Sequence, residues 1–390
     1  MSLFKRLVAA LCCMAQLLCL SGCMGTTIFS ASHEIEKIEI IRTLGVDLSG
    51  TGVCLTADSG VGLNGTPPRL YRQEAASLAT AIDILKNNYP DRQPFFTHTE
   101  NLLIGEQAAE AGISGWLDYI ARSPNMRLLI DLVVVRGDTA GAVMEGVMSD
   151  KTSVSDMLFD LAADIRMQGA GSMTDCRQVL AQMLDSRCTM VQAVKAVPAN
   201  GTGGAEQMLA PWGFALFKDG KLAGYLEPEL AVAVNLFTGE FEAFNVAVKN
   251  EETSVSLHFT EATVSFQPVY DGGRLTRVDV AVSAAADVTE LFSETHPEFA
   301  TLRKAVEQAA AGQIQTHMEQ AVSVTQALGG DYMGLGKQVE LADPAAFRAL
   351  DASWEEIYSD LDVQISVQVT LRETYDVDTP MFTGGEENGN

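Results

Sequence analysis

Apolar residues in the first part of the chain recur with strand and helix periods that predict a mixed α/β domain over residues 35–150. The expected strands are 38–48, 52–57, 95–105 and 128–137, and the expected helices are 73–88, 106–122 and 139–148. The run 128–137 is almost wholly apolar, which is typical of a strand buried on both faces of a sheet. Asp138 follows it as the expected N-cap of the third helix.

A second region, residues 151–250, is expected to form a middle α+β domain around a hairpin. Its expected elements are a helix through Met157, Leu158, Leu161 and Ile165, a helix at 174–184, a strand at 189–197, a short helix at 228–236 and a strand at 240–249. Asp219-Gly220 divides the strand-like segment 213–226, and this dipeptide is a strong signal for a two-residue hairpin turn.

The third region, residues 251–376, predicts an antiparallel sheet packed against a long helix. Alternating apolar residues mark strands near 255–259, 275–284 and 362–374, and a helix is expected from Pro297 to about Leu328, where Gly329-Gly330 ends it. At about 1.5 Å per residue the helix reaches about 45 Å, long enough to lie across a sheet. Ser353 and Glu356 have the spacing of a capping box. The acidic, glycine-rich residues 377–390 predict a disordered tail.

The chain begins with the pattern of an export signal. Lys5-Arg6 precede an apolar run from Leu7 to Leu20, which as a helix would rise only about 21 Å, less than a hydrocarbon core of about 30 Å. A positive start, a short apolar middle and small residues at the end are typical of a secretory signal peptide, and residues 1–22 are assigned to it.

The leader ends in Leu20-Ser21-Gly22-Cys23, which resembles a bacterial lipobox. In that pattern the cysteine thiol receives a diacylglyceryl group and the chain is cut just before it. Acyl chains of this kind hold a protein durably on a membrane surface. The prediction is that Cys23 is the lipid anchor and that residues 23–34 form a tether; the alternative is an ordinary signal peptide with a chance cysteine.

The net charge of the chain limits the classes of partner that it could bind. The formal net charge of −25 predicts repulsion from nucleic acid and from anionic lipid headgroups, so the lipid alone is expected to hold the protein on its membrane.

Three cysteines follow Cys23 in the sequence, and this odd number does not indicate a disulfide framework. Cys176 and Cys188 are expected to be buried free thiols, with a disulfide between them as the alternative.

The sequence motifs that could bind a nucleotide or a metal are incomplete or stand in the wrong structural context. Gly60, Gly62 and Gly65 match Gly-x-Gly-x-x-Gly, but Thr66-Pro67-Pro68 prevents a helix from starting there, so a dinucleotide site is not expected. The segment GLGK at 334–337 lacks the first glycine and the final Ser or Thr of a P-loop. The five histidines never fall at ligand spacing. No catalytic residue, metal ligand or cofactor is therefore assigned.

The loop after the long helix is the candidate partner contact. Tyr332, Met333 and Leu335 are apolar residues between Gly329-Gly330 and Gly336, where close-packed backbone is expected. They either fill the core of the third domain under the loop or present an exposed apolar contact to a partner. The sequence leaves both alternatives open.

Four blocks in order resemble the Ger(x)C family of spore germination lipoproteins, the C subunits of nutrient germinant receptors. They are HEIEKIEIIRTLGVDLSGTG (33–52), FFTHTENLLIGEQAAEAGISGWLDYIARSPNMRLLIDLVVVRG (95–137), GFALFKDGKLAGYLEPE (213–229) and DYMGLGKQVELADPAAFRALDASWEEIYSDLDVQISVQVTLR (331–372). The resemblance covers almost all of the chain after the leader. It implies an α+β fold of three mixed α/β layer domains behind a lipoprotein signal peptide.

The resemblance also implies a function without enzymatic activity. The protein would be lipid-anchored on the outer surface of the inner spore membrane, with two integral-membrane receptor subunits as partners, and it would serve the germination response to small nutrients. A solute-binding lipoprotein of a transporter is the alternative, but it should have two similar lobes and a hinge. An enzyme of the cell envelope would need a catalytic cluster, and the sequence shows none.

Overall fold

The computed structural model describes residues 38–50, 52–62, 65–89, 92–199, 206–249, 253–293 and 299–372. Its strands are β1 (Ile38–Ile40), β2 (Thr43–Ser49), β3 (Gly52–Asp58), β4 (Leu70–Ala75), β5 (Gln93–Phe95), β6 (Asn101–Gly105), β7 (Asp131–Val135), β8 (Thr174–Asp175), β9 (Cys188–Pro198), β10 (Gln207–Lys218), β11 (Lys221–Leu226), β12 (Phe244–Lys249), β13 (Thr253–Asp271), β14 (Arg274–Ser293) and β15 (Asp362–Leu371). Its helices are α2 (Leu78–Asn88), α3 (Glu106–Ala111), α4 (Ser114–Arg122), α5 (Ala140–Val147), α6 (Val154–Gln168), α7 (Cys176–Asp185), α8 (Ala231–Thr238), α9 (Phe299–Ala327), α10 (Leu335–Ala342), α11 (Pro344–Leu350) and α12 (Trp354–Asp360), with 3-10 turns η3 (Pro228–Leu230) and η4 (Asp351–Ser353).

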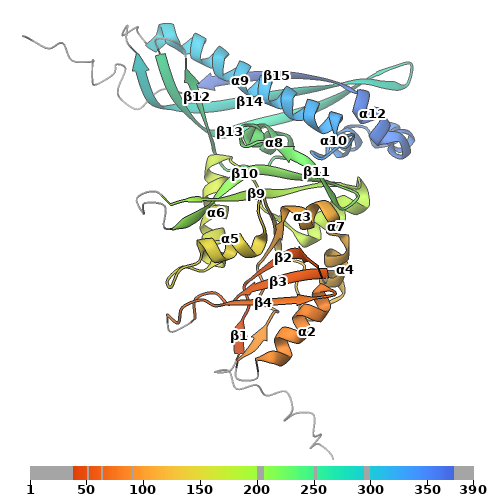
Figure 1. Cartoon of the computed structure of the whole chain (residues 1–390). Helices are drawn as coiled ribbons and strands as arrows, with labels where there is room; N and C mark the ends of the chain where they lie inside the picture. Colours follow the sequence, from red (N-terminus) through yellow and green to blue (C-terminus); the bar gives the residue numbers. More distant parts are fainter. Residues whose placement is uncertain are drawn as a thin grey trace, which may run out of the picture.

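The molecule is elongated, with β1 and α2 at one end and the α9–β15 layer at the other (Figure 1). Within the described residues, nine strands form a central sheet in the order β11-β10-β9-β7-β6-β2-β3-β4, with β8 paired to β7. β2, β6, β7 and β9 run parallel, and the outer strands are antiparallel. Because β7 pairs with β9, the boundary expected between residues 150 and 151 falls inside one continuous sheet and does not separate two sheets.

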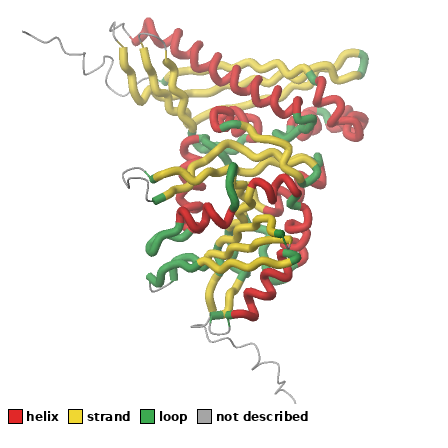
Figure 2. Tube along the Cα trace, viewed as in Figure 1, coloured by secondary structure: helices red, strands yellow, loops and turns green. Residues whose placement is uncertain are grey.

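Helices cover both faces of the central sheet (Figure 2). One core lies between the sheet and α2, α3, α4 and α7, and another lies between the sheet and α5 and α6. Leu132 and Val134 on β7 point into the first core, whereas Val133 and Val135 point into the second. The expectation that this strand is buried on both faces is confirmed, because side chains of a strand alternate between its faces.

A second sheet forms the other half of the molecule, with the described strands in the order β12-β13-β14-β15. The first three are antiparallel, as expected, but β15 runs parallel to β14. The reason is the connection, because the chain crosses back through α9 to α12 before β15 begins, and parallel neighbours need such a crossover. The long helix is present as α9 and packs along β15, near the bounds that the sequence predicts.

The two halves share a hydrophobic core and so form one body. Met190 on β9 and Phe214 on β10 belong to the same buried cluster as α8, α9 and the second sheet. Phe244 on β12 stacks on Phe259 on β13 inside this cluster, with 4.5 Å between ring centroids. The strands β9 and β10 therefore contribute side chains to a core of the central sheet on one face and to the core of the second half on the other face.

Several local expectations are corrected. Residues 70–75 form β4, so the helix expected at 73–88 begins only after Ser77, whose side chain caps α2. The strand expected at 95–105 is two strands, β5 and β6. The helix expected at 106–122 breaks at Gly112, whose φ of 122° ends α3. Asp138 is not the cap of α5, because the Thr139 side chain accepts the bond from Ala142 N. Ser353 makes no side-chain cap.

Other local expectations are confirmed. Asp219 and Gly220 both have positive φ, 52° and 74°, as the tight turn between β10 and β11 requires. The segment with Gly60 and Gly62 is followed by β4 and not by a helix. The alternative of a Cys176–Cys188 disulfide is wrong, because both thiols are free and buried. Burial raises the pKa of each thiol to about 12, so neither is reactive near neutral pH.

Candidate functional site

The loop after α9 is organised around a buried carboxylate. Asp331 is 5% exposed, and it accepts hydrogen bonds from Leu335 N (2.8 Å), Gly336 N (2.6 Å) and Trp354 Nε1 (2.9 Å). Burial raises its pKa, while these hydrogen bonds act in the opposite direction. The carboxylate thus satisfies the free N–H groups that begin α10, and it ties them to α12.

Two glycines in this loop are required by its geometry. Gly334 precedes α10 with a φ of 74°, a conformation that favours glycine. A Cβ on Gly336 would lie 2.5 Å from Trp354 Nε1, too close for any side chain. The segment GLGK therefore starts a helix whose N–H groups are already bound by Asp331, and the same groups cannot hold a phosphate.

The candidate contact residues lie beneath this loop. Tyr332 and Met333 are each 5% exposed and Leu335 is 2% exposed, and all belong to the core cluster that contains Trp354 and Tyr358. Their burial agrees with the alternative in which they fill the domain's own core. An apolar contact offered to a partner would need exposure that these side chains do not have.

A groove of about 970 Å³ separates the α7 end of the central sheet from α10, η4 and α12. Acidic and basic side chains are mixed along it, including Asp185, Arg187, Lys337 and Glu356. Arg187 is paired with Asp219 at 2.5 Å and Lys337 with Glu340 at 2.6 Å. Both basic side chains are therefore already ion-paired within the protein.

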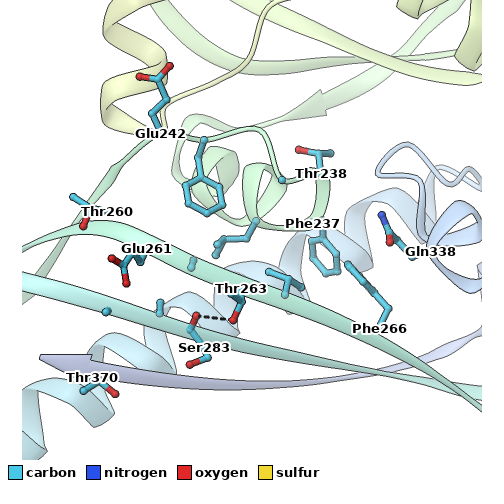
Figure 3. A pocket seen from close by; sticks show the side chains of 17 residues that line it. Phe237, Thr238, Glu242, Thr260, Glu261, Thr263, Phe266, Ser283, Gln338 and Thr370 are labelled. Atoms are coloured by element: carbon cyan, nitrogen blue, oxygen red, sulfur yellow. Dashed lines mark hydrogen bonds between the residues drawn. The ribbon is translucent and has the colours of Figure 1, made fainter. Parts of the chain in front are cut away.

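A second hollow of about 720 Å³ lies between the end of α8 and strands β13 and β14 (Figure 3). Phe237 and Phe266 form its apolar wall, with 6.3 Å between their ring centroids. Glu242 and Glu261 lie at its rim, and Glu261 is paired with Arg372 at 2.8 Å. Figure 3 shows Thr263 near the floor, where its hydroxyl donates to the Ser283 carbonyl oxygen.

The carboxyl ends of the parallel strands, where α/β sheets commonly bind ligands, are filled by the protein's own groups. Asp47 on β2 accepts hydrogen bonds from Ala140 N (2.7 Å) and Gly141 N (2.8 Å) and so caps α5. A Cβ on Gly105 would lie 2.1 Å from Asp47 Oδ1, so this contact also requires glycine. Nearby, the Tyr225 hydroxyl donates to Glu106 at 2.7 Å. The polar groups at the carboxyl ends of the parallel strands therefore stabilise the fold.

A third buried carboxylate, Asp58, lies at the end of β3. It is fully buried and accepts hydrogen bonds from Gly60 N (3.0 Å) and Ser155 N (3.4 Å). Burial raises its pKa to about 6. Arg42 lies nearby and its charge partly offsets the effect of burial on this pKa, but its guanidinium is ion-paired with Glu100 at 2.9 Å and with Asp156 at 3.0 Å.

The buried position of Asp58 leads to a prediction about pH. Its folded-state pKa lies above the unfolded value, so its stabilising protonated form is complete below about pH 4 and is lost as the pH rises through about 6. Relative to wild type, Asp58→Asn should therefore gain up to about 3 kcal/mol of unfolding free energy between pH 4 and pH 7. Urea unfolding over this range measures the difference.

Asp156→Asn is the matched control for this prediction. Burial alone would raise the pKa of Asp156, but hydrogen bonds from Ser153 and the charge of Arg42 outweigh burial and lower it. Because the pKa of Asp156 is below its ordinary value in the folded state, the loss of stability relative to wild type develops below about pH 4. Between pH 4 and pH 7 the difference from wild type should stay nearly constant, unlike that of Asp58→Asn. The same slope for both variants would contradict the assignment.

Histidines and acidic residues show no metal-binding arrangement in the ranges that the structure describes, where no three His, Cys, Asp or Glu side chains are grouped to hold an ion. His258 Nδ1 lies 2.8 Å from Asn245 Oδ1, and His98 lies beside Phe95. His33 and His296 lie outside the described residues, as do Cys23, the tether and the tail. No helix in the described part of the chain is both long and apolar enough to cross a bilayer.

Known protein families match both halves of the chain. A family model described as "Spore germination protein N-terminal domain" matches residues 31–196, and one described as "Spore germination B3/ GerAC like, C-terminal" matches residues 212–375. The two models together cover both halves of the molecule. The chain belongs to the Ger(x)C family of spore germination proteins.

Individual relatives of this Ger(x)C protein are distant in sequence. It is 22% identical to a putative spore germination protein, YfkR, of Bacillus subtilis (strain 168) over 283 residues, which are 71% of each chain. Its fold is similar to the crystal structure of the GerBC protein, with a TM-score of 0.54 and 15% identity, over 87% of this chain and 100% of that one. The α+β fold that the sequence resemblance implied is confirmed.

Sequence reasoning did not identify the buried carboxylates that organise the Ger(x)C fold here. A signal was present, because Asp47 interrupts the apolar segment LGVDL and Asp331 stands three residues before Gly334. A charged residue inside an apolar strand is usually buried only when it is paired or hydrogen-bonded. The hydrogen-bond donors to these aspartates could not be predicted, because Ala140 and Trp354 are far from them in the sequence.

Proposed function

We propose that this protein is a non-enzymatic lipoprotein subunit of a spore nutrient germinant receptor. In this proposal, Cys23 holds it on the outer surface of the inner spore membrane, and it acts with two integral-membrane subunits in the response to small-molecule nutrients. The observation that carries the proposal is the match of both Ger(x)C family models, in order, to residues 31–196 and 212–375. The lipobox at Leu20–Cys23 supports the anchor.

The geometry supports a structural and binding role. The buried aspartates Asp47 and Asp331 accept hydrogen bonds from backbone N–H groups at the starts of helices. A solute-binding lipoprotein is disfavoured, because its two lobes should be alike and hinged. Here a central sheet and a smaller second sheet are different in topology, and they share a core within the described residues.

Deleting the gene in spores tests the proposal. Nutrient-triggered germination through the receptor should be lost, while a stimulus that bypasses nutrient receptors should act at its normal rate. The fall in optical density of spore suspensions measures both responses, and restoring the gene should restore the nutrient response. Unchanged germination with every nutrient tested, in a strain that lacks related subunits, would contradict the proposed function.

A further inference from the structure

The groove between α7 and the segment α10–α12 has an apolar floor. Met190 on β9, Phe214 on β10 and Met333 after α9 line it, and these residues are only 8%, 1% and 5% exposed. The volume of about 970 Å³ is within the range of sites that hold small molecules. The groove therefore follows β9 on the face where the central sheet meets the second half of the molecule.

One end of the groove holds Tyr332 beside the start of β9. A Cβ on Gly330 would lie 2.5 Å from Cys188 Sγ and 3.0 Å from Tyr332 Cε2, so the phenol ring packs next to Cys188. The Tyr332 hydroxyl is buried and has no hydrogen-bond partner within the described residues. Glu355 Oε1 is buried and unpartnered in the same way, and both residues line the groove.

The other end of the groove holds Asn235 on α8. Its Nδ2 donates to the carbonyl oxygens of Gly169 and Gly171, each at 3.0 Å, and these bonds fix the side chain. Its Oδ1 has no hydrogen-bond partner in the part of the chain that the structure describes, and the residue is 1% exposed. Glu240 also lines this end, where its backbone N–H donates to the Asn235 carbonyl oxygen at 3.1 Å.

Strand β9 gives the distance between the two ends. The first end lies at Cys188. The second end lies near Gln192, because Asn235 binds Gly171, and the N–H of the next residue, Ser172, donates to Gln192 Oε1 at 3.1 Å. Four residues of strand extend about 13 Å. Each end thus offers an unpartnered neutral group and a carboxylate, and apolar side chains lie between the ends.

The charge of the groove favours a cation. Some exposed charged residues line it without an ion pair in the described structure, and four of these are acidic whereas one is basic. They are Asp185, Glu240, Asp351 and Glu356, and Arg348. A cleft with a surplus of one sign of charge attracts ligands of the opposite sign. An anionic ligand is therefore disfavoured.

We propose that this groove binds an elongated organic amine with a positive charge at each end of a hydrocarbon chain. One ammonium group donates to the Tyr332 hydroxyl and pairs with Glu355, and the other donates to Asn235 Oδ1 and pairs with Glu240. The hydrocarbon chain lies on the apolar floor. Such a ligand supplies the donors that the buried polar atoms lack. The Lys218–Glu355 pair is long, 3.6 Å, so the Glu355 side chain can turn to admit the ligand.

Isothermal titration calorimetry of the full-length protein in a nonionic detergent tests the site, with spermidine as the probe. The titration is made at about 0.15 M salt, which screens exposed charges beyond about 8 Å. Spermidine should bind with a stoichiometry of one. Triethylene glycol, an uncharged chain, should not bind, because it cannot pair with the carboxylates.

Tyr332→Phe is the decisive variant, because it removes only the unpartnered hydroxyl. The dissociation constant for spermidine should rise about tenfold, the effect of about one lost hydrogen bond. The melting temperature should not fall, since this hydroxyl has no partner to lose within the described residues. Tyr270→Phe is the matched control, because the Tyr270 hydroxyl is also buried and unpartnered but lies outside the groove. It should leave binding unchanged.

Glu356→Gln tests the contribution of charge. Glu356 and Glu74 on β4 are both exposed, and only Glu356 lines the groove. Glu356→Gln should weaken spermidine binding about threefold, whereas Glu74→Gln, which changes the net charge equally, should leave it unchanged.

The opposite results would overturn the amine site. They are no binding of spermidine to wild type, equal binding of triethylene glycol, equal effects of the two phenylalanine variants or of the two glutamine variants, and a lower melting temperature for Tyr332→Phe. The groove and its charges are independent of the proposed function. Loss of nutrient germination on gene deletion would therefore uphold the receptor role even if spermidine does not bind.

Discussion

Replacing Cys23 by Ala is expected to abolish lipid attachment and processing of the protein. Its thiol is the only group at the end of the leader that fits the lipobox Leu20-Ser21-Gly22-Cys23. Without acyl chains, a chain with a net charge of −25 has little affinity for an anionic membrane surface, so the mature protein should be lost from membranes. Metabolic labelling with palmitate and membrane fractionation measure the two effects.

Cys19→Ala is the matched control, because it removes a thiol from the same leader outside the lipobox. This variant should be labelled, cut and retained on membranes like wild type. Equal palmitate incorporation in Cys23→Ala would contradict the lipid anchor. Germination should fall in the Cys23→Ala spores along with membrane retention, which links the anchor to the proposed receptor role.

Asp331→Ala is expected to cause the largest loss of folding stability among the substitutions considered. The change removes the acceptor for Leu335 N, Gly336 N and Trp354 Nε1, and it leaves buried donors without partners. Hydrogen bonds to charged groups contribute about 1.5–3 kcal/mol each, so the free energy of unfolding should fall by about 3–5 kcal/mol. Urea unfolding of residues 24–390 measures the loss.

Asp343→Ala is the control for a carboxylate cap at the protein surface. Asp343 accepts a hydrogen bond from Ala346 N at the start of α11, and its loss should cost about 1 kcal/mol. Comparable losses for the two aspartates would mean that Asp331 does not organise the loop.

Leu335→Ala separates the two alternatives for the candidate contact residues. As a core residue, Leu335 should lose roughly 2–4 kcal/mol of stability on truncation. A normal melt combined with failed receptor assembly would instead favour the partner contact.

Sequence patterns alone predicted elements whose cause is local. The apolar run 128–137 indicated a strand buried on both faces, and β7 has that position. Asp219-Gly220 predicted the β10–β11 turn because this turn needs positive φ at both residues, a property of those residue types. Helix α9 ends near Gly329, whose φ of 66° is likewise a local property.

The carboxylate networks show what local patterns cannot supply. Asp47 and Asp331 could be recognised as unusual, but their partners lie on other elements, and only packing brings Ala140 or Trp354 to them. The candidate residues Tyr332, Met333 and Leu335 were equally consistent with a core and with a contact. They lie in one core cluster with Trp354 on α12, and α10 packs against β13, so their burial depends on elements from distant parts of the chain.

By itself, the sequence determined the order of most strands and helices, the family through four blocks in order, and the prediction of a lipid anchor at Cys23. The tertiary structure alone decided that β7 and β9 join one central sheet across residue 150 and that β15 runs parallel to β14. The physical reason is that periodicity reports which face of an element is buried, whereas pairing depends on the crossover path and on contacts between residues far apart in the chain.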